Sequence, residues 1–134
     1  MKTEKKNILV VDDEPRNTRL LKLYLEQTSA YVVLEENNPK AALAAAEKFQ
    51  PHLILLDVMM PGMDGGELAS RMQASPKLKR VPIVFLTAAV TKGEVEAKGG
   101  QLGGFPFLAK PVVLSEVLTG LKQHLGAAEA SKSF

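Results

Sequence analysis

A chain of 134 residues fits one domain with a substantial core. Its composition, 46% hydrophobic and 24% charged, is that of an ordinary globular protein. The formal net charge of +2 and the scattered basic residues argue against direct nucleic-acid binding, and no apolar run approaches the roughly 20 residues that cross a bilayer. The absence of cysteine excludes disulfides and thiolate metal sites and suits a reducing compartment. We therefore expect a cytoplasmic protein with no membrane insertion.

Short apolar runs alternate with longer amphipathic stretches along the chain, as in repeated βα units. Strands are predicted at about 7–11, 31–35, 53–56, 82–86 and 105–109, and helices over 15–28, 40–49, 64–72 and 114–125. The stretch 91–104 contains five glycines, so we expect only a short or mobile helix there. The predicted fold class is α/β, a doubly wound five-stranded parallel sheet.

Local signals predict details of several elements. Asn38 should cap the second helix and Pro39 should open it. Pro106 lies inside the strand at 105–109, where its missing N–H suggests an edge strand. Residues 126–134 lack periodicity, so the domain is expected over 1–125 with a flexible tail over 126–134. The inward face of the first helix is predicted to carry Leu20, Leu21, Tyr24, Leu25 and Thr28.

Acidic residues follow two of the predicted strands. The apolar run 8–11 ends in Asp12 and Asp13, and the run 53–56 ends in Asp57. If the first and third strands flank the point where the winding reverses, these carboxylates meet in the crevice at the carboxyl ends of the strands. Three negative charges there are costly unless a cation or a proton relieves them, and Mg²⁺ prefers such oxygen ligands.

Two further strands also end in polar residues, Thr87 and Lys110. A metal, a carboxylate, a hydroxyl and an ammonium group together suggest phosphoryl chemistry, with Asp57 as the nucleophile. Such a transition state needs positioning and charge neutralisation, which Lys110 can provide as a compact cation and Thr87 as a hydroxyl donor.

Segments 10–15, 55–65, 86–88 and 109–111 carry four short motifs in order at the strand ends. Over about 6–125 the chain resembles the receiver domains of two-component response regulators. The resemblance implies a flavodoxin-like sheet in the order 2-1-3-4-5 with five helices. It also implies Mg²⁺-dependent phosphoryl transfer to Asp57 from a phosphohistidine on a sensor histidine kinase or phosphotransfer protein. A change in partner binding follows, and a phosphorylation-dependent dimer is compatible with it.

The resemblance also implies roles at the metal site. Asp13 and Asp57 would bind Mg²⁺ directly, Asp12 would act through water, and the main-chain carbonyl of Met59 would be a further ligand.

Beside the phosphoryl group, the resemblance implies contacts from Thr87 and Lys110. Phe107 matches a switch aromatic that changes rotamer when Thr87 moves toward the phosphate. Each residue has a structural alternative, since Thr87 is an ordinary strand-end residue and Phe107 an ordinary core aromatic. Met59 and Ala89 depart from relatives in which polar side chains steer the hydrolytic water.

Several functions remain in competition. The leading one is a stand-alone phosphoacceptor switch that loses its phosphoryl group slowly and turns over no separate substrate. A receiver fragment of a longer regulator or hybrid kinase is an alternative. An aspartate-nucleophile phosphohydrolase would need a second Asp where Met59 stands. A flavin-binding module of similar topology is disfavoured because Asp12 and Asp13 would repel the flavin phosphate. The sequence does not identify the kinase or the downstream target protein.

Overall fold

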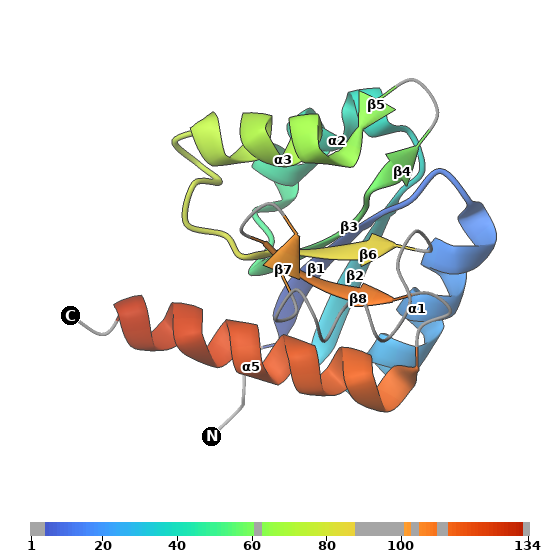
Figure 1. Ribbon diagram of the computed structural model, residues 1–134. Coiled ribbons are helices and arrows are strands. Elements are labelled where there is room, and N and C mark those ends of the chain that lie inside the picture. The colour runs from blue at the N-terminus through green and yellow to red at the C-terminus, as the bar shows by residue number, and fades with distance from the viewer. Residues whose placement is uncertain (1–4, 61–62, 88–100, 103–104, 110–112, 133–134) are drawn as a thin grey trace.

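The computed structural model describes residues 5–60, 63–87, 101–102, 105–109 and 113–132. Five parallel strands form its sheet (Figure 1): β1 (Lys6–Val11), β2 (Tyr31–Glu36), β3 (Leu53–Asp57), β6 (Ile83–Thr87) and β8 (Phe105–Ala109). The spatial order is β2-β1-β3-β6-β8-β7, so the parallel strands follow the predicted order 2-1-3-4-5. The added strand β7 (Gln101–Leu102) is antiparallel to β8.

Helices cover both faces of the sheet. In Figure 1, α2 (Ala42–Phe49) and α3 (Gly65–Ala74) lie on one face, and α1 (Pro15–Gln27) and α5 (Leu114–Lys132) lie on the other. A 3-10 turn, η1 (Pro39–Ala41), precedes α2, and the side chain of Asn38 accepts the Lys40 N–H as its cap. A short hairpin connects β3 to α3. It pairs two strands of two residues each, β4 (Met59–Met60) and β5 (Met63–Asp64).

Alternating residues of the strands pack into two apolar cores, one on each face of the sheet, because successive side chains point to opposite faces. The α2–α3 face buries Leu9, Val11, Ile54, Leu56 and Phe85 against Ala42, Ala46, Leu68 and Met72. The α1–α5 face buries Ile8, Val10, Leu53, Leu55 and Leu86 against Leu21, Leu25, Val117 and Leu121. Each fully buried aliphatic side chain contributes roughly 1.5–3 kcal/mol, so β1 and β3 are held firmly on both sides.

The predicted inward face of α1 is partly wrong. Leu21 and Leu25 are buried as expected, but Leu20 and Tyr24 are exposed, as is Thr28 just beyond the helix. Thr18, which was not on the predicted face, is fully buried and forms the buried stripe of the helix with Leu21 and Leu25. The helix is therefore turned so that the Thr18 hydroxyl faces β2, where it lies 2.9 Å from Glu35 Oε1.

Two further predictions need correction. The α5 backbone stays helical to Lys132, beyond the predicted helix end at position 125, which fits the strong helix propensity of the alanines at 127, 128 and 130. The flexibility of 126–134 stays a prediction. Gln101 and Leu102 form a strand instead of the end of a helix, and the rest of 91–104 lies outside the described residues. Because β7 pairs Gln101 with Pro106, β8 is not the outermost strand there.

Side chains of α1 cover the outer edge of β2. The Val33 N–H donates to Glu26 Oε2 at 2.9 Å, and Lys22 Nζ donates to the Val33 carbonyl oxygen at 2.9 Å. Lys22 and Glu26 also form an ion pair at 3.2 Å. Both main-chain groups of this edge residue are thus satisfied by the neighbouring helix.

Among the helices of the described ranges, none combines the length and apolar character needed to span a membrane.

Candidate metal and phosphoacceptor site

Strand register brings Asp12 and Asp57 together. Val11 of β1 is opposite Leu56 of β3, so the residues that follow each of them meet at the carboxyl edge of the sheet. Asp57 is the last residue of β3. Asp12, Asp13 and Asp57 each offer a carboxylate oxygen, and these oxygens lie within 4.8 Å of one another. The structure thus shows the clustering expected from the strand pattern.

The three carboxylates differ in exposure. Asp12 is 1% exposed and Asp57 5%, whereas Asp13 is exposed. Close negative charges in a partly buried site repel each other, and a divalent cation relieves that repulsion. Mg²⁺ takes oxygen ligands and keeps several waters, which suits a set of carboxylates that is open to solvent on the Asp13 side. The donor set therefore fits the ion that the resemblance implies.

The backbone that carries Asp57 is fixed from two directions. Its neighbour Val58 donates its N–H to the Leu86 carbonyl of β6 at 3.1 Å. The Val58 carbonyl in turn accepts the N–H of Gly65, the first residue of α3, at 3.0 Å. The backbone at Asp57 is thus tied both to the next strand and to the start of a helix.

Gly65, to which the sequence analysis assigned no role, lies against the backbone that carries Asp57. A Cβ at this position would lie 2.5 Å from the Asp57 carbonyl oxygen and 2.7 Å from Val58 Cα, both closer than real Cβ contacts. Only glycine lets α3 approach the acceptor strand so closely. The glycine at the end of the 55–65 motif was a sequence signal for a close approach of the backbone, although not for its partner.

A second missed group surrounds Asp12. Its Oδ1 accepts the Glu14 N–H at 2.9 Å, and its Oδ2 accepts an amide hydrogen of Asn17 at 3.1 Å. The main-chain carbonyl of Asp12 accepts an amide hydrogen of Asn37 at 2.9 Å. α1 begins at Pro15, so its positive N-terminal end lies beside this carboxylate.

The structure describes only some of the remaining predicted residues in full. Thr87 ends β6 opposite Ala109, but its side chain is not among the described groups, and Lys110 and Ala89 lie outside the described residues. The Met59 backbone belongs to β4. Phe107 is buried opposite Phe85. This position fits a packing role and leaves the switch role a prediction.

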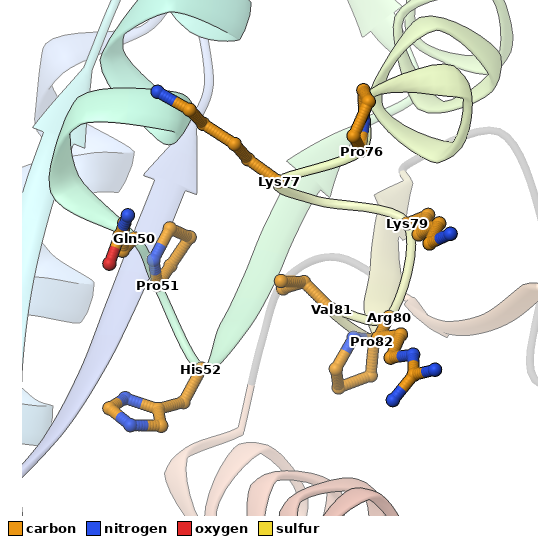
Figure 2. Close-up of a pocket in the computed structure, with 9 residues that line it drawn as sticks. All are labelled: Gln50, Pro51, His52, Pro76, Lys77, Lys79, Arg80, Val81 and Pro82. Atoms are coloured by element: carbon orange, nitrogen blue, oxygen red, sulfur yellow. The ribbon is translucent and has the colours of Figure 1, made fainter.

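A pocket of about 540 Å³ lies at the opposite edge of the sheet, among residues that precede β3 and β6. Figure 2 shows the segment 50–52 on one side and 76–82 on the other. Lys77 extends toward the α2 side, while the exposed side chains of Lys79 and Arg80 point away from Gln50. These cations do not converge on one point, and the pocket is not part of the carboxylate site.

Comparisons with known proteins agree with this geometry. The model of the response regulator receiver domain family matches residues 8–122. The chain belongs to this family. It is 38% identical to the transcriptional regulatory protein ResD of Bacillus subtilis over 134 residues, which cover 98% of this chain and 53% of ResD. The chain thus spans about half of that relative.

Two other matches are of similar size to this chain. An uncharacterised protein of Leptolyngbya boryana is 38% identical, with 88% of each chain covered. The crystal structure of the receiver domain of sensor histidine kinase PA1611 from Pseudomonas aeruginosa has a TM-score of 0.76 and 28% identity, covering 92% of this chain and 99% of that one. That structure has a magnesium ion coordinated in its active-site cleft.

Proposed function

We propose that this receiver domain is the phosphoacceptor switch of a two-component phosphorelay, with Asp57 as the acceptor. The observation that carries the proposal is the meeting of Asp12, Asp13 and Asp57 at the carboxyl edge of the sheet, with ligand oxygens within 4.8 Å of one another. The donor is a phosphohistidine on a sensor histidine kinase or phosphotransfer protein.

In the proposed reaction, a carboxylate oxygen of Asp57 attacks the phosphorus in line with the leaving imidazole. An O–P bond forms, the P–N bond breaks, and its electron pair returns to the histidine nitrogen of the donor. Most of the rate gain comes from positioning, which the hydrogen bonds of Val58 to β6 and to Gly65 support.

The metal site would be formed by Asp13 and Asp57 directly, by Asp12 through water, and by the Met59 carbonyl. Bound Mg²⁺ would neutralise negative charge on the phosphoryl oxygens. On the other side of the phosphoryl group, Lys110 would supply a fixed cation.

The output of the switch is a change in partner binding. Thr87 would donate its hydroxyl to the phosphoryl group, and Phe107 would respond by changing its packing, so that the phosphorylated surface differs from the resting one. The partners would be proteins, with no direct nucleic-acid contact by this domain, in the cytoplasm. We propose no turnover of a separate substrate.

Incubation with Mg²⁺ and acetyl phosphate tests the proposal. Mass spectrometry should show a gain of one phosphoryl group, localised to Asp57 and prevented by a chelator. Asp57→Asn removes the nucleophile but preserves the shape of the side chain, so this variant should fold and stay unmodified. Phosphoryl incorporation into Asp57→Asn at the wild-type rate would show that another residue is the acceptor.

A further inference from the structure

Asp12 accepts three hydrogen bonds from neighbouring residues. Each of its carboxylate oxygens accepts a hydrogen bond, from the Glu14 N–H and from the Asn17 amide, and its main-chain carbonyl accepts one from Asn37. The two donors, one to each oxygen, restrain the orientation of the carboxylate plane.

Asn37 is itself held by a series of hydrogen-bonded side chains. It follows the last residue of β2 and donates a second hydrogen bond to Thr18 Oγ1 at 2.9 Å. The Thr18 hydroxyl lies 2.9 Å from Glu35 Oε1 and 3.1 Å from the Pro15 carbonyl, either of which can accept its single hydrogen. Arg19 Nε donates to the other oxygen of Glu35 at 3.2 Å.

Members of this hydrogen-bonded series are buried, which makes the loss of a hydrogen bond costly. Thr18 is fully buried, and Glu35 keeps only 18% of its side chain exposed. Hydrogen bonds in such places are directional and expensive to leave unmade. These hydrogen bonds connect the end of β2 and the first turns of α1 to the end of β1, where Asp12 lies.

We propose that Asn17 and Asn37 are positioning residues for the Mg²⁺ site, acting through Asp12, and that Thr18 and Glu35 keep Asn37 in place. The proposal rests on the proposed function, because it assigns a role toward the ion of that site. Groups that orient a metal ligand reduce the conformational freedom that binding must remove. Removing either amide should therefore loosen Asp12 and weaken Mg²⁺ binding.

A purely structural role makes a different prediction. It would lower the free energy of unfolding and leave the Mg²⁺ affinity of the folded protein unchanged. Asn38 provides the matched control, since its side chain caps η1 through Lys40 and has a structural role of that kind. The three asparagines can be changed to alanine in the same way and compared directly.

Mg²⁺ titrations followed by calorimetry or by NMR of backbone amides measure the affinity. Asn17→Ala and Asn37→Ala should raise the Mg²⁺ Kd by roughly tenfold, while Asn38→Ala should leave it within error of wild type. Phosphorylation by acetyl phosphate should need correspondingly more Mg²⁺ but reach nearly the wild-type rate at saturation. Thr18→Val should weaken Mg²⁺ binding in the same direction, and Thr18→Ser, which keeps the hydroxyl, should restore it.

Two results would overturn the proposal while leaving the phosphoacceptor function intact. One is a wild-type Kd in both Asn17→Ala and Asn37→Ala. The other is an equal loss in Asn38→Ala. If Asn37→Ala proves too unstable to titrate, Asn17→Ala and the Thr18 pair decide the matter. A wild-type protein that neither binds Mg²⁺ nor accepts phosphate would instead overturn the proposed function.

Discussion

Gly65 lies against the main-chain carbonyl of Asp57, with no room for even one extra carbon between them. The two residues are separated by the β4–β5 hairpin, yet the helix that begins at Gly65 packs on the strand that ends at Asp57. Any side chain at position 65 must therefore move either the helix or the acceptor strand. Both outcomes would disturb the carboxylate cluster.

We expect Gly65→Ala to lower the free energy of unfolding by about 1–3 kcal/mol, the usual cost of overpacking, and to slow phosphorylation of Asp57. Chemical denaturation and acetyl phosphate time courses measure the two effects. Gly120→Ala is the matched control, because a Cβ there meets only Leu108 Cδ1 at 3.9 Å, an ordinary contact. In the middle of α5 that change should stabilise the protein by about 0.5–1 kcal/mol. Equal effects of the two substitutions would contradict the steric argument.

Charge repulsion within the carboxylate cluster gives a second prediction. Asp13→Asn should stabilise the metal-free protein by about 1 kcal/mol, the energy of two like charges about 4 Å apart in a water-like medium, and should weaken Mg²⁺ binding. Thermal melts with and without Mg²⁺ measure both changes. Glu116→Gln removes a negative charge from an exposed position in the first turn of α5, outside the cluster, where an acidic side chain is favourable, and should give no such gain. A lower melting temperature of metal-free Asp13→Asn would argue against repulsion.

Glu26 should make stability depend on pH. The Val33 N–H, and with it Lys22, holds the pKa of Glu26 below its usual value of 4.5. A carboxyl group whose pKa is lowered by folding contributes stability above its unfolded pKa. That contribution is lost as pH falls below 4.5 through the folded-state pKa. Because 36% of the side chain is exposed, we expect at most about 1 kcal/mol.

Urea unfolding of wild type and Glu26→Gln at about pH 6 and about pH 3 tests this. The variant should be less stable at the higher pH and nearly equal to wild type at the lower one. Glu67→Gln breaks an exposed pair with Arg71 at 2.9 Å and should change little at either pH. A gap between wild type and Glu26→Gln that persists in acid would rule out the ionised carboxylate as the cause.

A further prediction concerns the lifetime of the phosphorylated form. Hydrolysis needs a water in line with the Asp57–phosphorus bond, and neither Met59 nor Ala89 can hydrogen-bond it through a side chain. Met59→Asn combined with Ala89→Glu should therefore speed phosphoryl loss several-fold. Mg²⁺ affinity should change little, since the proposed ligand at residue 59 is a main-chain carbonyl. Decay in excess Mg²⁺ no faster than wild type would refute the water-positioning argument.

The clustering of Asp12 and Asp57 could be predicted because it depends only on where two apolar runs end in a parallel sheet. Thr18 could not be placed, since its burial depends on Asn37 and Glu35, partners that β2 delivers from a distant part of the sequence. The apolar residues of the first helix alone placed Leu20 and Tyr24 on the same face as Leu21 and Leu25, and left Thr18 out. The glycine at position 65 suggests a close approach, but its contact with Asp57 could not be predicted, because it depends on how the short β4–β5 hairpin folds the helix back onto β3.

The contact of Lys22 and Glu26 with Val33 has a consequence for the behaviour of the protein at high concentration. An edge strand with unsatisfied main-chain groups can recruit a strand from another molecule, and that recruitment begins aggregation. A strand from another molecule would have to displace the Lys22 ammonium and the Glu26 carboxylate from Val33 before it could pair with β2. Substituting Lys22 and Glu26 with alanine should leave the sheet intact. It should also make the protein prone to self-association, because the uncovered main-chain groups of β2 could then pair with a strand of another molecule.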